Sequence, residues 1–436
     1  MASRKPIFTE RIARNLEEYW PINFTVIGSA QWFEESFEAG AAEKLTKIYA
    51  DEDEAAVDEV VNFLATQKEV GLDTETMGTD RRAGLDPWRE GSRLLLLQIG
   101  TADRVWIVQP EYIYKFKDLL ENKDITFLLH NGVFDYKFIL IKYGIEIAKM
   151  KDTMISEQIL TAGRAGMRVG LADVCRRYKP YRLISKDQRK EFINFKERGN
   201  TFSWRMIYYA ARDIVLLFPI AEEQKLLLTK LNLIQTSIDE FNLIPCTAQM
   251  ETGGVYINQK TLEYAIAYWK ERQIELEDEI IRIYEEETKG TRKSSLLLIE
   301  GVGERMNVGS ATQKKKLLKD LGFEVDNIQR DTLKEIDHDV ARLLAEYSEV
   351  IKITSTYGEN LLQRINPATG RLHPEFNQLG LGDLDSKGGV RTASISTGRM
   401  SSNFQQMPKP KLRFGLVKDE ALINQLNELK RQKTNG

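Results

Sequence analysis

The sequence predicts an α/β domain with a mixed β-sheet, followed by a mainly helical region. Short apolar runs bounded by turn residues begin at Glu69 and alternate with helical patterns as far as Asp152. Beyond Asp152, apolar positions recur at helical spacing over long, charged stretches. At 436 residues the chain is too long for one compact core, so two or three domains are expected.

Four apolar runs predict strands: Glu69–Glu75, Arg93–Gly100, Arg104–Val108 and Ile125–Leu129. The short turn Thr101–Asp103 between the second and third runs predicts an antiparallel hairpin. Helical spacing predicts the helices: Val133–Tyr143, Arg205–Leu231, Thr261–Glu287, Thr312–Leu321 and Asp331–Ile365. The first of these helices follows the fourth strand, as in a sheet covered by helices.

A domain boundary is expected near residue 235. The reason is that Pro245 and the pair Gly253-Gly254 break the segment Asn242–Ile257, which follows the long helix. From Asn366 the chain turns to Gly, Ser and Thr, and it ends in a charged, helical tail at Asp419–Lys433.

Composition is typical of a globular protein, with 42% apolar and 29% charged residues. The longest purely aliphatic stretch, Leu94 to Leu97, is too short to span a bilayer, so no membrane partner is expected. Charged residues follow the first six residues where a signal peptide needs an apolar run. Cys175 and Cys246 lie far apart, which argues against a disulfide framework and a zinc cluster. A reducing, cytoplasmic location is expected.

The net charge of −3 gives no overall basic surface for nucleic acid. This is weak evidence against nucleic-acid binding, because local basic patches can supply the phosphate contacts while an acidic site lowers the total charge.

Two acidic residues end the first strand. Asp73 and Glu75 are two positions apart, so their carboxylates point to the same face and can share one cation. By itself such a pair is more often a solvated strand end.

Two further carboxylates follow on helices. Asp135 lies in the first turn after the fourth strand, and Asp213 lies on the long helix four residues after Tyr209, on the same face. Taken singly, Asp135 is better explained by the helix dipole, and Asp213 as a surface acid beside a core tyrosine.

Together these residues form three ordered motifs: Asp73-x-Glu75, Asn131-x-x-x-Asp135 and Tyr209-x-x-x-Asp213. The sequence here resembles the DEDD superfamily of 3′–5′ exonucleases, in the branch with Tyr in its third motif that is found in proofreading domains. The resemblance implies a ribonuclease H-like fold for this α/β domain. It also implies that Asp73, Glu75, Asp135 and Asp213 hold two divalent metal ions, Mg²⁺ or Mn²⁺, with Asp73 bridging them. Tyr209 would orient the attacking water.

Hydrolysis of a phosphodiester needs an activated water and a stabilised leaving 3′ oxygen, and two divalent ions can supply both. Carboxylate oxygens suit Mg²⁺ or Mn²⁺, and the scarcity of Cys and His argues against zinc. Asn131 is a candidate contact to the primer end, with a helix cap as the equal alternative. Gln98 is a further candidate for facing the nucleic acid. Asp152 is better explained as a helix N-cap.

The second half resembles the thumb and palm entry of family A DNA polymerases. The matching segments are Ile244–Val255, Asn307–Lys314, Leu372–Gln378 and Ser396–Ser402. Arg399 in the last segment and Lys314 beside two further lysines are candidates for contacts to the DNA backbone. A surface arginine in an ordinary turn and a solvated helix face are the alternatives.

The resemblance divides the chain into four parts: an N-terminal segment of unknown role (1–68), the 3′–5′ exonuclease domain (69–235), the partial polymerase thumb and palm entry (236–408) and a charged tail (409–436). A Gly-rich insertion, Gly380 to Gly389, and Gln405–Pro408 depart from the family pattern. The polymerase's palm and fingers motifs are absent, so this chain alone is not expected to polymerise. A split or interrupted gene, as some bacteriophages carry, would explain this, with a separate chain providing palm and fingers in the bacterial host cytoplasm.

The expected function is a metal-dependent 3′–5′ exonuclease acting on single-stranded DNA 3′ ends and primer-template DNA during replication. One alternative is a stand-alone RNA-trimming nuclease of the ribonuclease D type, which the thumb-like segments argue against. The other is a non-catalytic subunit that clamps DNA for a partner polymerase.

Overall fold

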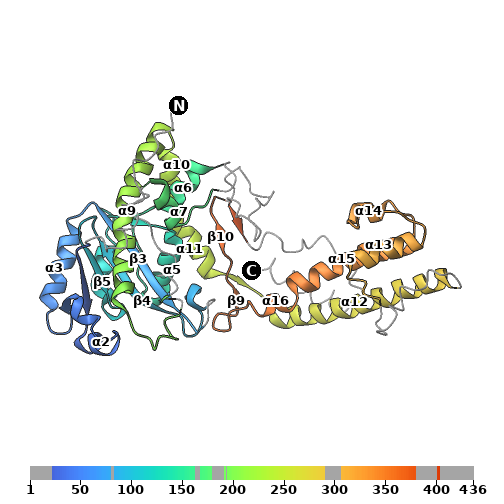
Figure 1. Cartoon of the computed structure of the whole chain (residues 1–436), viewed down its shortest axis with the longest axis horizontal. Helices are drawn as coiled ribbons and strands as arrows, with labels where there is room; N and C mark the ends of the chain where they lie inside the picture. The colour runs from blue at the N-terminus through green and yellow to red at the C-terminus, as the bar shows by residue number, and fades with distance from the viewer. Residues whose placement is uncertain are drawn as a thin grey trace, which may run out of the picture. The chain divides into compact units, whose positions relative to one another are not determined.

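The computed structural model describes residues 22–79, 83–162, 167–178, 191–192, 194–289, 306–379 and 400–402. These residues fall into two compact units (Figure 1). The first lies within Met1–Val255, Asn366–Thr369 and His373–Asn403, and the second within Tyr256–Ile365, Gly370–Leu372 and Phe404–Gly436. In the described ranges, none of the helices has the length and apolar character that crossing a bilayer requires.

The first unit contains a seven-stranded sheet in the order β2-β1-β5-β4-β3-β6-β7. The strands are β1 (Phe24–Gly28), β2 (Thr46–Tyr49), β3 (Glu69–Met77), β4 (Arg93–Gly100), β5 (Val105–Val108), β6 (Thr126–Leu129) and β7 (Met150–Asp152). β4 runs antiparallel to both β3 and β5, and the other neighbours pair in parallel. The predicted mixed sheet and the hairpin at Thr101–Asp103 are therefore confirmed.

The sheet begins earlier in the chain than the predicted domain limit at residue 69. β1 pairs with β5, and β2 pairs with β1, so both lie in the same sheet as β3. β1 is a single five-residue apolar run, too short for its pattern to separate a strand from a loop.

Helices cover both faces of the sheet. Those of the first unit are α2 (Ala30–Glu35), α3 (Glu54–Ala65), α4 (Lys117–Leu120), α5 (Gly132–Tyr143), α6 (Thr153–Thr161), α7 (Leu171–Tyr178), α9 (Trp204–Lys230), α10 (Ile234–Asn242) and α11 (Ile244–Gly253). Three 3₁₀ turns, Ala42–Lys44, Ala83–Leu85 and Pro110–Phe116, and the strands β10 (Phe376–Asn377) and β11 (Ser401–Ser402) complete it. Helix α9 confirms the long helix predicted over Arg205–Leu231, and Ser203 caps its N-terminus.

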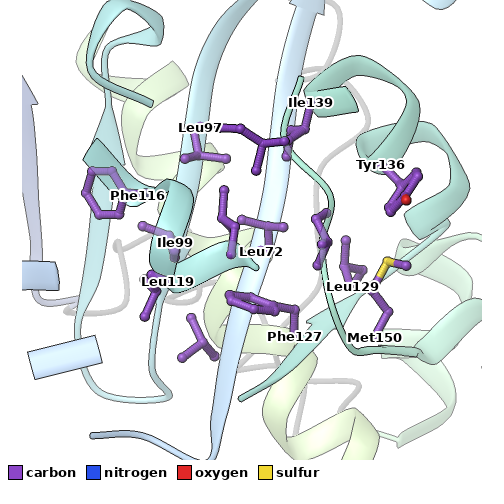
Figure 2. Close-up of a cluster of buried hydrophobic side chains, with 14 of the residues drawn as sticks. Leu72, Leu97, Ile99, Phe116, Leu119, Phe127, Leu129, Tyr136, Ile139 and Met150 are labelled. Atoms are coloured by element: carbon purple, nitrogen blue, oxygen red, sulfur yellow. The ribbon is translucent and has the colours of Figure 1, made fainter. Parts of the chain in front are cut away.

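Two hydrophobic clusters lie on the two faces of the sheet. Leu72, Leu97 and Phe127 pack with Tyr136 and Ile139 of α5 in one cluster, as Figure 2 shows. The alternate strand residues, such as Leu96 and Leu128, pack with α9 in the other. Because side chains alternate along a strand, each residue in the centre of the sheet belongs to α5's face or to α9's face. Burial of each large side chain contributes about 1.5–3 kcal/mol to folding.

Helix α11 corrects the expectation that Pro245 breaks the chain here. Pro245 lies in the first turn of α11, where a backbone N–H has no helical partner and its loss costs little. The helix continues to Gly253, beyond which Gly254 adopts a positive φ of 59°. Gly254 ends the helix, because a residue without a side chain adopts a positive φ easily.

Buried polar contacts tie α11 to the rest of the first unit. Glu251, 5% exposed, accepts from the Lys137 ammonium of α5 and from the Phe376 backbone N–H. The Trp88 indole donates to the Thr252 carbonyl at 2.9 Å. The two compact units accordingly divide after Val255 rather than near residue 235. Removal of one partner of a buried ion pair costs roughly 3–5 kcal/mol, so these contacts fix α11 firmly.

The second unit is helical, as predicted for this region. It contains α12 (Gln259–Thr288), α13 (Ala311–Asp320), α14 (Arg330–Lys334), α15 (Asp339–Tyr357) and α16 (Glu359–Leu362), with β8 (Val255–Tyr256) and β9 (Arg371–Leu372) at its limits. Its core joins Leu276, Ile280 and Tyr284 of α12 to Leu344 and Tyr347 of α15.

The single helix predicted over Asp331–Ile365 is wrong. His338, in an extended conformation, caps the N-terminus of α15, and Gly358 separates α15 from α16. Periodicity alone does not reveal these interruptions, because the apolar positions continue at helical spacing through them. The predicted tail helix at Asp419–Lys433 lies outside the described residues.

The contact between β3 and α9 is tight enough to test. A Cβ atom on Gly71 would lie 2.8 Å from Ile214 Cγ2 and 3.2 Å from Phe218 Cε2, both on α9. We expect Gly71→Val to lower the free energy of unfolding by about 1–3 kcal/mol, since the larger side chain pushes α9 from the sheet. Urea unfolding followed by circular dichroism measures this. Gly253→Ala is the control, since nothing lies within 4 Å of its Cβ position. Equal stability of the two variants would contradict the packing described.

Candidate active site

Strand β3 places Asp73 and Glu75 on the face of the sheet that α9 covers. Gly71, two residues before Asp73 and on the same face, lies directly under Ile214 of α9. The register between β3 and β4 shifts between Glu75 and Thr76, a β-bulge at the end of the acidic pair. A bulge bends its strand and re-aims the neighbouring side chains. The two predicted carboxylates of the first motif therefore lie beneath α9.

Helix α9 brings the third motif to the same place. Tyr209 and Asp213 are one helical turn apart, and they are 6% and 5% exposed. A side-chain hydrogen bond joins them; the charge of Asp213 acts on Asp73, and the charges of Glu75 and Asp73 act on Tyr209. The Arg212 guanidinium carbon lies 5.4 Å from the centre of the Tyr209 ring, within range of a cation–π interaction. The phenol is thus held by Asp213 at its oxygen and by Arg212 at its ring.

Asp135 approaches from the other helix. It lies in the first turn of α5, is buried, and accepts a hydrogen bond from Thr74 Oγ1 at 2.6 Å. Thr74 alternates with Asp73 and Glu75 along β3, so its side chain points towards the α5 face of the sheet. Sequence reasoning overlooked Thr74, although its place between the two acids, on the face that α5 covers, could have suggested it.

Asp152 fixes the start of α5. Its carboxylate accepts from the backbone N–H groups of Gly132 at 2.6 Å and Asn131 at 3.3 Å. It also accepts from Met154 at 2.7 Å and Ile155 at 3.1 Å, at the start of α6. The prediction of an N-cap at Asp152 is confirmed, and the same carboxylate also serves α5.

Asn131 stands at the N-cap position of α5 in a left-handed conformation, with φ of 72°. Its side chain makes no capping hydrogen bond and is exposed. The capping alternative is therefore wrong for the side chain, because Asp152 supplies the oxygen. The contact of Asn131 to nucleic acid stays a prediction.

The carboxylates shift one another's proton affinity. Burial raises the pKa of Asp73 well above its ordinary value, and Asp135, Glu75 and Asp213 raise it further. Burial likewise raises the pKa of Asp135, to about 7, against the opposing hydrogen bond from Thr74. The part of a shift that comes from a neighbouring charge requires the two charges to lie close together. Asp135, Glu75 and Asp213 therefore lie within electrostatic range of Asp73.

Tyr209 remains a phenol at neutral pH. Burial raises its pKa above the ordinary value of 10, and the charges of Asp213 and Glu75 raise it further. A group in this state donates a hydrogen bond and does not act as a base. This supports the role expected for Tyr209, the orientation of a water molecule.

The chemistry of these donors fits hard divalent cations. All four are carboxylates, which Mg²⁺ and Mn²⁺ prefer, and mutual repulsion gives them a reason to bind positive charge. In the described part of the chain, no three acidic, His or Cys side chains already converge as a ligand set. Instead, Thr74 holds Asp135 by a hydrogen bond, and Tyr209 holds Asp213 in the same way. A cation would have to compete with these hydrogen bonds.

The other residues predicted to contact nucleic acid do not lie where they were expected or lie outside the described residues. Gln98 is 0% exposed, so the expectation that it faces nucleic acid is wrong. It lies in β4 directly opposite Asp73, covered on the α9 face. Arg399 lies outside the described residues.

Lys314 is 6% exposed, so the expectation that it grips the DNA backbone is also wrong. Its ammonium lies 5.0 Å from the centre of the Tyr347 ring, and burial lowers its pKa. Helical spacing places it on the same side of α13 as Leu317 and Leu318, which are buried. The exposed lysines of this turn are Lys315, Lys316 and Lys319.

Two family models match the sequence. Residues 50–228 match a model described as 3'-5' exonuclease, and residues 260–425 match one described as DNA polymerase family A. A DNA polymerase I of Rhizobium leguminosarum is 25% identical over 334 residues, covering 72% of this chain and 29% of the relative. A DNA polymerase I of Borreliella burgdorferi is 25% identical over 363 residues, covering 81% and 36%. The chain thus spans about a third of the length of these curated relatives.

The fold is similar to a solved structure of a polymerase. The POL domain of Pol1 from M. smegmatis, in complex with DNA primer-template and dNTP, has a TM-score of 0.55 at 15% identity, covering 84% of this chain and 55% of that chain. The two family matches thus divide the chain into an exonuclease-like part and a polymerase-like part. The predicted fold class, an α/β ribonuclease H-like domain with a mixed sheet followed by a mainly helical region, is confirmed.

The raised pKa of Asp135 predicts how stability depends on pH. A carboxyl whose pKa is higher in the folded state binds its proton more tightly there, so stability is greatest below the unfolded value and falls as pH rises through the folded value. For Asp135 this window runs from 3.8 to about 7. In EDTA, we expect the urea midpoint of the chain to fall across it, and to fall less in Asp135→Asn, which has no charge to bury. The same fall in both proteins would contradict the shift.

Proposed function

We propose that this chain is a metal-dependent 3′–5′ exonuclease that hydrolyses the 3′ ends of single-stranded DNA, the proofreading activity of a family A polymerase. One observation carries the proposal: Glu75, Asp135 and Asp213, from three elements, all raise the pKa of Asp73 by their charge, and Asp73, Glu75 and Asp213 do the same to the phenol of Tyr209. The matches to the exonuclease and polymerase models support it.

Each residue of the site has a role in this proposal. Two divalent cations, Mg²⁺ or Mn²⁺, when bound supply the positive charge that acidifies a water molecule and stabilises the departing 3′ oxygen. Asp73, Glu75 and Asp213 would hold the cation beside the water. Asp73 and Asp135 would hold the second cation.

Tyr209 orients the water by a hydrogen bond at its hydroxyl group. Because its pKa is raised, it keeps its proton; with that proton donated to Asp213, its oxygen accepts from the water. Arg212, stacked over the ring, limits the directions in which that hydroxyl group can point. Asn131, exposed at the start of α5, is placed to contact the nucleotide at the 3′ end.

The polymerase-like second half favours DNA over RNA as the substrate. Residues 260–425 match the polymerase family, which a stand-alone RNA-trimming nuclease has no need of. The exposed lysines at the start of α13 offer a sequence-independent grip on a phosphate backbone. That palm and fingers residues are supplied by a separate chain stays a prediction.

Asp73→Ala tests the site. We expect kcat on a single-stranded DNA oligonucleotide with Mg²⁺ to fall by at least about 1000-fold, because the carboxylate shared by both cations is lost. In EDTA the variant should be as stable as the wild type or more so, since a buried acid repelled by its neighbours is gone. Asp103→Ala, on an exposed turn, is the control and should keep full activity. Retention of nuclease activity in Asp73→Ala would falsify the assignment.

A second experiment identifies the nucleic acid. DNA and RNA oligonucleotides of the same sequence, labelled at the 5′ end, are incubated with the chain and Mg²⁺, and the shortened products are resolved on a gel. We expect stepwise removal from the 3′ end of DNA, with RNA degraded at least about ten times more slowly, because the 2′ hydroxyl is the group by which a site can distinguish RNA from DNA. Faster degradation of RNA would favour the ribonuclease alternative.

A further inference from the structure

Gln98 stands beside Asp73 at the centre of the sheet. In the antiparallel pair of β3 and β4, the two residues are directly opposite, so their side chains project from the same face. On its other side, Gln98 pairs with Ile107 of β5. The residue is 0% exposed. An amide is thus sealed within the layer between the sheet and α9.

The Gln98 amide has no hydrogen-bond partner within the described ranges, at either Nε2 or Oε1. A buried polar group without a partner costs free energy, and in native proteins such a group calls for a specific explanation. The rest of β4 shows that an apolar residue suits this strand, which reads Arg-Leu-Leu-Leu-Leu-Gln-Ile-Gly. Simple packing therefore does not account for a glutamine at this position.

The nearest explanation is the carboxylate opposite. We propose that Gln98 is a positioning residue for Asp73: when cations bind, its Nε2–H group donates to the Asp73 carboxylate, directly or through one water. This inference rests on the proposed function, because it concerns the same metal site. A carboxylate that bridges cations needs its direction fixed, and an uncharged donor fixes it without adding another charge to the acids already there.

A contrast within the chain sharpens the inference. Gln224 of α9 is also buried, at 1% exposed, but its Nε2 donates to the Thr153 carbonyl and to Glu157, each at 2.9 Å. The Nε2 group of Gln224 is therefore fully used in the fold, although its Oε1 has no partner within the described ranges. Gln98 makes no such hydrogen bond. We expect this if its partner, the Asp73 carboxylate, reaches its final position only when a cation binds.

Gln98→Leu in the full chain tests the proposal without relying on nuclease activity. Binding of Mn²⁺ is measured by electron paramagnetic resonance in the absence of nucleic acid, and stability by urea unfolding in EDTA. We expect Mn²⁺ affinity to fall about 10- to 100-fold, the usual effect of losing a group that orients a metal ligand. The urea midpoint should stay the same or rise, because an unsatisfied buried amide is removed.

Gln224→Leu is the matched control and should show the opposite pattern, a lower urea midpoint with unchanged Mn²⁺ affinity. Gln98→Met, which keeps the length of the side chain, is the second variant and should behave as Gln98→Leu does. Wild-type Mn²⁺ affinity in either Gln98 variant overturns the positioning role. So does a loss of stability in both variants, since it shows that the amide serves the fold. If Asp73→Ala also binds Mn²⁺ as the wild type does, the metal site itself is wrong, and the proposed function fails with it.

Discussion

Repulsion among carboxylates around Asp73 is the constraint on which the rest of this domain depends. Packing brings the acids together from β3, α5 and α9, and burial removes the water that would otherwise screen them. The fold must therefore contribute the free energy that keeps them close. It does so through two hydrophobic layers, one on each face of the sheet, which hold α5 and α9 against the same central strand.

Hydrogen bonds from uncharged groups also help to keep the acids in place. Thr74 donates to Asp135, and Tyr209 hydrogen-bonds with Asp213, so two of the acids are supported before any cation arrives. Neither donor adds charge to the acids that it supports. Gln98 is likewise uncharged, and it lies opposite Asp73, whose pKa is raised well above its ordinary value.

Much of this arrangement could be predicted from the sequence, and the limits have physical causes. The strands β3 to β6 and the helices α5 and α9 follow from local patterns. Burial, however, depends on which side of an element meets a partner, and a motif does not report this. Gln98 and Lys314 were both expected at the surface because their residue type is polar, yet packing encloses both. Thr74 was overlooked because a threonine acquires its role only when α5 is set against β3.

The double cap at Asp152 links the stability of two helices. Since one buried carboxylate receives backbone N–H groups from the starts of both α5 and α6, neither helix can fray at that end without releasing the other. Amide protons of both first turns should then exchange with solvent in a single cooperative opening, rather than in two independent ones. Asp135 lies within that first turn of α5, so the lifetime of an assembled site is governed in part by Asp152, a residue with no exposed surface.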